Sequence, residues 1–550
     1  MDELITALRG AFARREAGRL PEALAAYGAI LRAQPDEPRA LLGLADTLHL
    51  AGELGRAAET YRRLLLLEPA LAGAWWGLGC TRTAQRDHAA AAEAYRRLLA
   101  LEPAHGMALA NLGRSLFELG DVDGAVHAFR AAQPLLPPEA ASLPLVNLAT
   151  IVPGATSATD AEVLEARRDL ARTLGAAAPA PPVRGSAGPV RLGYVSAFFS
   201  ARNWMKPVWA LLRHHDRARF QLHLFADRPA GGGALDFAPH PGDVVHDITG
   251  LANDAVARQV RDLEIDVLVD LNGYSRPTRL PLFLLRPAPV QVAWFNMFAT
   301  SGLEGAFDAL VGDQHVVPPE EERWYGERIL RVAGSYLTFD VAYPVPDVAP
   351  APGRAGEALT FGCLAPQYKV TPEVIASWSR ILVASPGSRL FLKNSLLGTG
   401  STRAYLRAQF ARHGIGPERL VLEGPDEHFR FLAAYDRIDV ALDTFPYNGG
   451  TTTMEALWQG VPVLTFRGDR WAARISASLL REAGLGEWVA CDRADYEARA
   501  IALATDPDAP VRLAQLRRGM RERLRAARVC DVEGFARRME EIYLKLLRER

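Results

Sequence analysis

The residues best suited to chemistry lie in one segment of the C-terminal half, Asp443–Trp458. An apolar run ends at Asp443, a loop with Pro446 and two glycines follows, and three threonines then open a helical pattern. The free N–H groups of a helix N-terminus, together with glycines and hydroxyls, form a pocket for an anion. Glu455, in the first turn, is suited to accept hydrogen bonds from sugar hydroxyls. The alternative is that Thr451 only caps the helix and Glu455 only matches its dipole.

Short apolar runs alternate with helical patterns around this segment, which predicts parallel α/β layers. The expected strands are 190–195, 220–225, 267–271 and 290–295 in a first series, and 359–364, 389–393, 420–422, 440–443 and 461–465 in a second. A proline-rich break at 344–352 separates the two series. We therefore expect two Rossmann-like halves with a ligand cleft at the carboxyl ends of their strands.

A repeat with a period of 34 residues occupies the N-terminus. Its aromatic residues are Tyr27, Tyr61, Tyr95 and Phe129, its prolines are Pro35, Pro69, Pro103 and Pro137, and its small helix-pairing residues are Ala11, Ala45, Gly79 and Gly113. Glycine recurs at Gly18, Gly52 and Gly120, with Arg86 as the exception. This period predicts four tetratricopeptide (TPR) units, which stack into a superhelix with a concave groove for a polypeptide. The alternative, a generic helical bundle, keeps no such register.

Composition narrows the class of protein. A chain of 550 residues with 49% hydrophobic content predicts about three packed domains. A net charge of −1 gives no indication of a nucleic-acid partner, and we interpret the arginine-rich stretch 512–528 as a solvated helix face. Four scattered cysteines without metal spacing fit a reducing cytoplasm. We expect neither a secretion signal nor a membrane span.

Several stretches carry a resemblance to a known family. The segment Asp443–Pro462, preceded by Gln367-Tyr368-Lys369 and by 284–293 (LLRPAPVQVA), resembles the catalytic region of the O-GlcNAc transferases, glycosyltransferase family 41. Members join TPRs to a two-domain GT-B glycosyltransferase and modify protein side chains, usually Ser or Thr, from a nucleotide sugar. The resemblance extends from the repeats to about residue 546, and it is to a bacterial member. It implies an α (TPR superhelix) plus α/β fold, with two Rossmann-like halves of a GT-B glycosyltransferase.

The resemblance also assigns roles to residues. Lys369 matches the family lysine at the donor diphosphate, where a cation would stabilise the leaving group, so we expect it to be catalytic. Thr451 and Thr452 match a threonine pair at the diphosphate, Glu455 takes the place of the ribose-binding acid, and His428 resembles the histidine that stacks on the base. The expected donor site is completed by Gln367, Asn448, Gly449 and Gly450. A surface lysine and a surface histidine are the alternatives for Lys369 and His428.

The sequence departs from the family around the sugar and acceptor. Arg202 stands where the family has histidine, and 296–302 (NMFATSG) replaces a Gly-Tyr-Pro-Gly-Thr-Ser-Gly segment. The candidate sugar or acceptor contacts are Arg202, Tyr274, Thr300 and Ser301. An arginine beside the sugar could pair with a carboxylate, which would make the donor an acidic sugar, such as a CMP-linked nonulosonic acid. The alternative is that Arg202 faces solvent.

The predicted order of domains follows from these observations. It is a TPR superhelix (1–136), transition helices and linker (137–188), the acceptor-side GT-B half (189–340), a linker (341–357), the nucleotide-sugar-side half (358–530) and a C-terminal helix (531–550). In the transition, Thr159 and Glu162 have capping-box spacing before a helix that we expect to end at Leu174. The C-terminal helix is amphipathic, and we expect it to pack back on the first half.

Together these features predict a cytoplasmic, inverting, metal-independent protein glycosyltransferase. Its acceptor would be a Ser or Thr of a protein held by the TPR groove, and its only small-molecule requirement would be the nucleotide sugar, without cofactor or metal. Two alternatives stay open. One is a glycosyltransferase for flagellin or another surface protein that uses an acidic donor, and the other is a TPR adaptor whose transferase domain is inactive.

Overall fold

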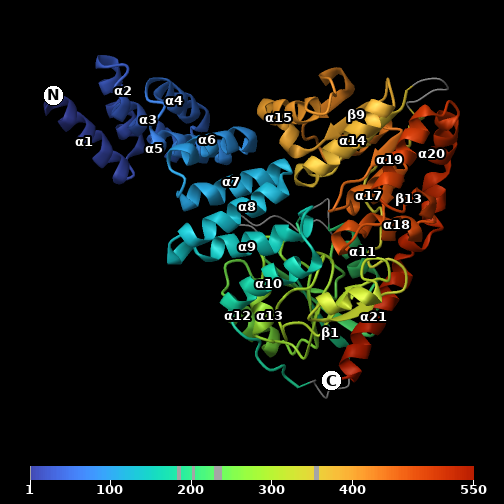
Figure 1. The fold of residues 1–550 in the computed structure, drawn as a ribbon. Coiled ribbons are helices and arrows are strands. Elements are labelled where there is room, and N and C mark those ends of the chain that lie inside the picture. The colour runs from blue at the N-terminus through green and yellow to red at the C-terminus, as the bar shows by residue number, and fades with distance from the viewer. Residues whose placement is uncertain (1, 183–187, 201–204, 228–237, 352–357) are drawn as a thin grey trace. The chain divides into compact units, whose positions relative to one another are not determined.

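The computed structural model describes residues 2–182, 188–200, 205–227, 238–351 and 358–550. The chain divides into two compact units, whose elements are labelled in Figure 1. The repeat unit comprises Met1–Pro144 and Ser395–Ala408, and the two-sheet unit comprises Leu145–Asn394 and Gln409–Arg550.

The repeat unit contains the four predicted helix pairs. They are α1 (Asp2–Glu16) with α2 (Leu20–Ala33), α3 (Pro38–Leu50) with α4 (Leu54–Leu67), α5 (Ala72–Ala84) with α6 (His88–Leu101), and α7 (Gly106–Leu119) with α8 (Val122–Ala132). In the first three pairs the second helix ends two residues before the repeated proline, because proline cannot supply the N–H that would continue the helix. The beginning of α15 (Gly400–Ala411) also belongs to this unit.

Aromatic rings and glycines explain the tight packing of the repeats. A Cβ on Gly43 would lie 2.3 Å from the ring of Tyr27, which belongs to the preceding helix pair. Within the third pair, a Cβ on Gly79 would lie 2.5 Å from the ring of Tyr95. Both distances are far below van der Waals contact, so only glycine allows these approaches. The expected role of the small helix-pairing position is confirmed at Gly79.

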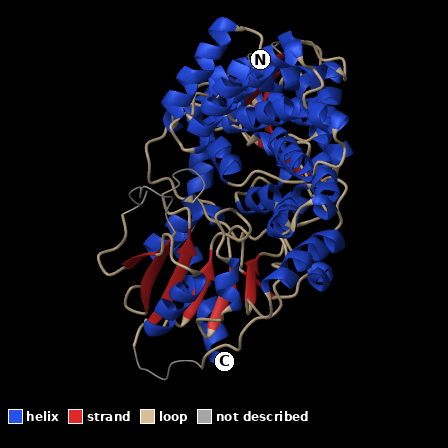
Figure 2. Cartoon of the chain, turned by 90° about the vertical axis from the view of Figure 1, so that its left-hand side faces the viewer, coloured by secondary structure: helices blue, strands red, loops and turns tan. Residues whose placement is uncertain are grey.

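Two parallel sheets form the centre of the two-sheet unit. Among the described residues the first sheet has the order β3-β2-β1-β4-β5-β6-β7, and the second has the order β10-β9-β8-β11-β12-β13. The strands are β1 (Val190–Ser196), β2 (Phe220–Ala226), β3 (Val244–Asp247), β4 (Val267–Asp270), β5 (Val290–Ala293), β6 (Ala309–Gly312), β7 (Arg328–Arg331), β8 (Thr360–Cys363), β9 (Arg389–Lys393), β10 (Leu420–Glu423), β11 (Val440–Leu442), β12 (Val463–Phe466) and β13 (Val489–Ala490). Figure 2 shows strands in red with helices packed beside them. All described pairings are parallel, as predicted.

Helices connect and cover these strands. They are α9 (Ser142–Ile151), α10 (Asp160–Leu174), α11 (Lys206–His214), α12 (Asn253–Asp262), α13 (Leu280–Leu284), α14 (Pro372–Ala384), α16 (His428–Ala433), α17 (Thr451–Trp458), α18 (Ile475–Glu482), α19 (Arg493–Thr505), α20 (Ala509–Arg525) and α21 (Val532–Arg548). The capping box predicted at Thr159 and Glu162 is present at the start of α10. No helix within the described residues is both long and apolar enough to cross a membrane.

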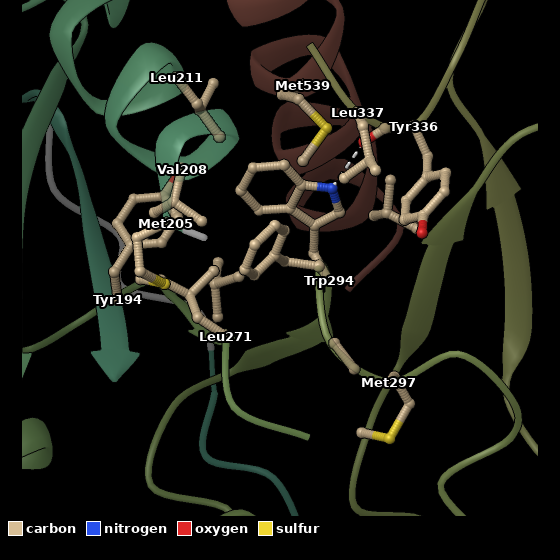
Figure 3. Close-up of a cluster of buried hydrophobic side chains, with 14 of the residues drawn as sticks. Tyr194, Met205, Val208, Leu211, Leu271, Trp294, Met297, Tyr336, Leu337 and Met539 are labelled. Atoms are coloured by element: carbon tan, nitrogen blue, oxygen red, sulfur yellow. Dashed lines mark hydrogen bonds between the residues drawn. The ribbon is translucent and has the colours of Figure 1, made fainter. Parts of the chain in front are cut away.

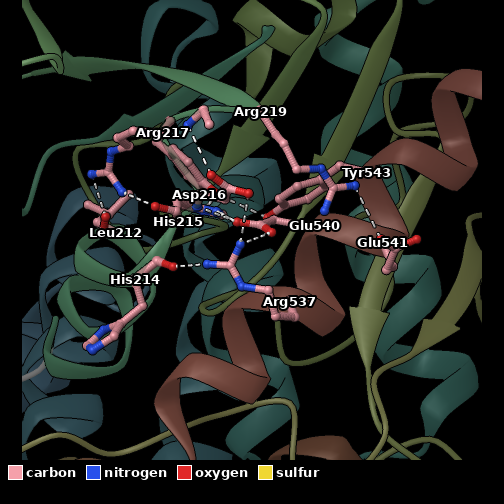
Figure 4. A network of polar contacts seen from close by, with 12 residues as sticks. Leu212, His214, His215, Asp216, Arg217, Arg219, Arg537, Glu540, Glu541 and Tyr543 are labelled. Carbon is pink, nitrogen blue, oxygen red and sulfur yellow. Dashed lines mark hydrogen bonds and ion pairs between the residues drawn. The ribbon is translucent and has the colours of Figure 1, made fainter.

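The C-terminal helix packs on the first sheet, as predicted. Trp294, which directly follows β5, is buried and donates from Nε1 to the carbonyl of Tyr336 at 2.9 Å. Met539 of α21 points toward its ring in Figure 3. A polar network fixes the same helix, since Glu540 accepts from the backbone N–H of Asp216 at 2.8 Å and lies 3.0 Å from Nδ1 of His215 (Figure 4). The helix therefore closes the first half through apolar and polar contacts.

The interpretation of 512–528 as a solvated helix face is wrong at Arg517. Its guanidinium is buried and donates to the carbonyls of Ile438 (2.8 Å), Tyr435 (2.9 Å) and Ala349 (2.9 Å). Arginine can be buried when carbonyl oxygens satisfy its fork of donors. Arg517 of α20 therefore binds both the linker, at Ala349, and the segment that follows α16, at Tyr435 and Ile438.

Candidate functional site

The predicted donor residues gather where the order of the second sheet reverses. Strands β8 and β11 are neighbours, but the chain leaves them in opposite directions, which makes their carboxyl ends the topological switch point of the sheet. Gln367 and Lys369 follow β8 in a short 3-10 turn. The loop 443–450 follows β11 and leads into α17. Residues far apart in sequence are therefore brought together at the position that open α/β sheets use for ligands.

Lys369 is a buried cation above the loop. Its Nζ donates to the carbonyl oxygen of Asn448 at 2.6 Å and lies 3.8 Å from the centroid of the Tyr447 ring. Burial lowers the pKa of Lys369 to about 8, against the opposing pull of the neighbouring Asp443. The ammonium is thus mostly charged at neutral pH and has lost most of its water. Such a group is prepared to stabilise negative charge that develops beside it.

Asp443 organises the loop below Lys369. Its carboxylate accepts from the backbone N–H of Gly449 at 2.9 Å and from the hydroxyl of Thr465 at 2.7 Å. Gly449 has no room for a side chain, because a Cβ there would lie 2.4 Å from Oγ1 of Thr453. The loop is therefore held in one shape before any ligand arrives.

The start of α17 presents donors without an internal cap. The N-cap residue is Gly450, which has no side chain to bond the first N–H groups, and Thr451 and Thr452 are the first two helical residues. Thr451 is therefore not the N-cap, which disfavours the alternative that it serves only to cap the helix. Within the described part of the chain, the side-chain hydroxyls of Thr451 and Thr452 make no hydrogen bond. They and the helix N–H groups remain available to an anion.

Glu455 takes part in a buried ion pair that the sequence did not predict. Its carboxylate contacts Nζ of Lys206, and the side chains of the two residues are 3% and 2% exposed. Lys206 begins α11, which belongs to the first-sheet half, so the pair joins the two halves. Nε2 of His428 lies 3.1 Å from Nζ of Lys206 and 3.6 Å from the carboxylate of Glu455. Tyr343 completes the cluster, with its ring centroid 4.1 Å from the same ammonium.

Burial opposes both charges of this pair. It lowers the pKa of Lys206 and raises the pKa of Glu455, and in each case the partner's charge acts in the opposite direction. Each ion therefore depends on the other to stay charged. The only sequence signal for Lys206 was its place in the loop after the first strand, where this chain departs from the family pattern.

Three predicted sugar or acceptor contacts lie in a buried network of the first half. The hydroxyl of Tyr274 donates to the carbonyl of Ser301 at 2.6 Å, and Thr300 donates to Glu327 at 2.8 Å. Ser301 donates its backbone N–H to the same glutamate at 2.7 Å. Arg167 of α10 donates to the carbonyl of Met297 at 3.0 Å and lies over the ring of Tyr274. These polar groups support the loop, and their contact with a sugar or acceptor stays a prediction. Arg202 lies outside the described residues.

Gln367 is buried and accepts from Nδ2 of Asn394 at 3.2 Å, beside the carboxyl end of β9. The structure thus forms two clusters from the predicted donor residues. Lys369, Asn448, Gly449, Gly450, Thr451 and Thr452 surround the loop and helix start, and Glu455 and His428 join Lys206. No group of three or more metal-ligating side chains occurs in the ranges that the structure describes. The donors available at this site are ammonium, hydroxyl and backbone N–H groups.

Comparison with known proteins places this arrangement in a class, the TPR-fused GT-B glycosyltransferases. A model of the tetratricopeptide repeat matches residues 9–74 and 77–140. A solved structure of a mutant O-GlcNAc transferase from Thermobaculum terrenum is similar over 93% of this chain and 97% of that chain, with 31% identity and a TM-score of 0.75. The model of glycosyl transferase family 41 matches residues 180–349 and 352–539, and the chain belongs to that family.

Curated plant proteins are also similar to the chain. A rice protein named probable UDP-N-acetylglucosamine–peptide N-acetylglucosaminyltransferase SPINDLY is 33% identical over 366 residues, which is 66% of this chain and 39% of that protein. Its Arabidopsis thaliana counterpart is 32% identical over 364 residues, 64% of this chain and 39% of the relative. The chain thus spans about two fifths of the length of these relatives.

Proposed function

We propose that this protein transfers a sugar from a nucleotide-sugar donor to a serine or threonine side chain of a protein held by its TPR groove. The observation that carries the proposal is the position of Lys369 above the 443–450 loop, beside the uncapped start of α17. Family membership and the names of the similar rice and Thermobaculum proteins support the same activity.

The chemistry that this site suits is displacement at the anomeric carbon. The acceptor hydroxyl oxygen forms a bond to that carbon while the bond to the diphosphate oxygen breaks, and the hydroxyl proton is released. The products are the glycosylated side chain and a nucleoside diphosphate. The leaving group gains charge during the step, and Lys369, the hydroxyls of Thr451 and Thr452 and the first N–H groups of α17 stabilise it. In this proposal they replace a metal ion, and attack opposite the leaving group inverts the anomeric centre.

The two alternatives lack comparable support. No observation on the described residues favours an acidic sugar or a flagellin acceptor, since the arginine that suggested the sugar lies outside them. An inactive adaptor has no need for a buried lysine above a fixed anion loop.

The test is incorporation of label by the purified full chain. UDP-N-acetylglucosamine, a GDP-hexose and a CMP-nonulosonic acid, each radiolabelled in the sugar, are incubated separately with the enzyme and a mixture of proteins. We expect one neutral-sugar donor to label protein. Labelling from the CMP donor alone would favour the acidic-sugar alternative. Nucleotide binding without transfer or hydrolysis of any donor would favour the adaptor.

A further inference from the structure

The repeat unit contains a polar pocket of about 520 Å³. Its lining comes from α3, α5, α6 and α7 and from the turn before α6, and includes His49, Cys80, Arg86, His88, Arg114 and Glu118. The first helices of three successive repeats contribute to this wall. The pocket therefore belongs to the stack as a whole and not to one repeat.

Arg86 occupies a position where the other repeats use glycine. Gly18, Gly52 and Gly120 have φ values of 71°, 77° and 93°, and Arg86 has a φ of 57°. A side chain makes this left-handed conformation unfavourable, so glycine would be the better residue for the turn. The arginine contributes a charge at the pocket in place of the better turn residue. Local conflicts of this kind are concentrated at functional positions.

The pocket has an excess of positive charge. Among the described residues, neither Arg86 nor Arg114 forms an ion pair, and Glu118 is the only acidic residue of the lining. The neighbouring Asp87 is already engaged, because it lies 3.6 Å from Arg82 and accepts from the hydroxyl of Ser401. Two guanidinium groups thus face one carboxylate.

One position of the repeat is acidic in the second repeat and basic in the fourth. Arg114 stands 68 residues, two repeats, after Asp46. Asp46 accepts hydrogen bonds from Tyr61 and Arg15 and so is satisfied within its own repeats. At the equivalent place of the fourth repeat the structure offers an arginine without such a partner. Arg114 in the fourth repeat would therefore attract an acidic ligand, whereas Asp46 in the second repeat would repel one.

His88 is a buried residue of the same lining. The residue is 4% exposed, and its Nδ1 has no hydrogen-bond partner within the described structure. Burial lowers the pKa of His88 to about 4, and the charges of Arg114 and Arg86 act in the same direction, so the ring is neutral at physiological pH. A neutral ring adds no charge, so the positive charge of the lining comes from Arg86 and Arg114.

We propose that this pocket binds the carboxylate of an aspartate or glutamate in the polypeptide that the repeats hold. Arg86 and Arg114 are the contacts that bind it. The inference rests on the proposed function only in taking that polypeptide to be the transfer acceptor. An acidic residue some distance from the modified Ser or Thr would then select acceptors.

Direct binding of peptides to the full chain tests the site apart from catalysis. The probe is a fluorescein-labelled peptide of three Gly-Ser-Glu-Glu repeats, and its matched control has Gln in place of every Glu. We expect the Glu peptide to bind at least tenfold more tightly at low salt, and the difference to shrink as salt screens the charges. A third peptide with phosphoserine in place of each Glu pair separates carboxylate from phosphate recognition.

Two variants locate the effect. Arg86→Gly removes the charge and restores the glycine of the other repeats, so we expect weaker binding of the Glu peptide with a thermal midpoint equal to or above that of the wild type. Arg114→Gln should weaken the same peptide without affecting the Gln control. Arg96→Gln, an exposed arginine of α6 outside the pocket, is the matched control and should change neither.

The outcomes separate this proposal from the proposed function. Equal binding of Glu and Gln peptides, or unchanged binding by both pocket variants, would overturn the pocket assignment even if the protein proves to be an active transferase. Binding of the phosphoserine peptide, without binding of the Glu peptide, would overturn the assignment of a carboxylate as the ligand. Charge-dependent binding that is lost in Arg86→Gly and Arg114→Gln would support the pocket even if no donor sugar is transferred.

Discussion

The buried pair Lys206–Glu455 allows a quantitative prediction about what joins the two halves of the two-sheet unit. Removing one partner leaves the other charge buried without compensation, which typically costs 3–5 kcal/mol. The unit has roughly 390 residues, so its unfolding entropy is about 0.8 kcal/mol/K. Lys206→Met and Glu455→Gln should therefore each lower the thermal midpoint of this unit by about 4–6 °C.

The double variant distinguishes the ion pair from ordinary packing. With both charges gone, no ion is left unpaired. The double variant should therefore lower the thermal midpoint by much less than the sum of the two single decreases. The expected coupling is about 2–4 kcal/mol. The exposed pair Arg328–Glu549, at 2.5 Å, provides a control cycle of similar geometry, and Arg328→Met with Glu549→Gln should show a coupling below about 1 kcal/mol.

The assay is thermal unfolding followed by tryptophan fluorescence at several salt concentrations. The coupling energy of the buried pair Lys206–Glu455 should stay the same at high salt. The coupling energy of the exposed pair Arg328–Glu549 should decrease, because only exposed charges are screened effectively. Strictly additive effects at Lys206 and Glu455 would refute the reasoning. They would mean that this ion pair does not join the two halves, which would leave that role to packing and to other contacts such as the Arg474–Glu321 pair.

Three further predictions follow from the site. Because the pKa of Lys369 is lowered to about 8, its charged form declines above that value, and kcat/KM should fall as pH rises through about 8, measured with a saturating acceptor. Gly449→Ala should abolish nucleotide binding in calorimetry, because the new methyl would lie 2.4 Å from Thr453 Oγ1, whereas Gly326→Ala, with nothing within 4 Å, should bind normally. Arg167→Met should destabilise the two-sheet unit by about 3 kcal/mol in thermal unfolding, since buried carbonyls lose their donors; an unchanged midpoint would contradict its supporting role.

Much of the architecture could be predicted from sequence because it depends on local patterns. The 34-residue period determines helix lengths and contacts such as Tyr27 on Gly43, and each of the nine expected apolar runs overlaps a strand. The strands that were not predicted are β3, β6, β7 and β13. β3 is partly exposed, and β7 has an arginine at each end, so neither gives a continuous apolar signal.

The site was only partly predictable for a different reason. The 443–450 loop and the start of α17 are contiguous in sequence, so glycines, threonines and an acid could be recognised together. Lys206 is separated from Glu455 by 249 residues, and only the packing of the two halves brings the two side chains together. Arg517 shows the same limit, because the carbonyls that bury its charge come from other elements. Tertiary partners of charged residues leave no local pattern.

The measurement that tests the central claim most directly is transfer by Lys369→Met. Methionine keeps the length and apolar stem of lysine, so the variant should keep the fold and still bind nucleotide, while it loses the hydrogen bond to the Asn448 carbonyl and a preorganised charge at the developing diphosphate. We predict that labelled sugar is transferred to protein about a hundred- to thousandfold more slowly, and that Lys545→Met, an exposed lysine of α21, transfers at the wild-type rate. Transfer by Lys369→Met within a few-fold of the wild type would contradict the claim that this site performs the reaction through Lys369.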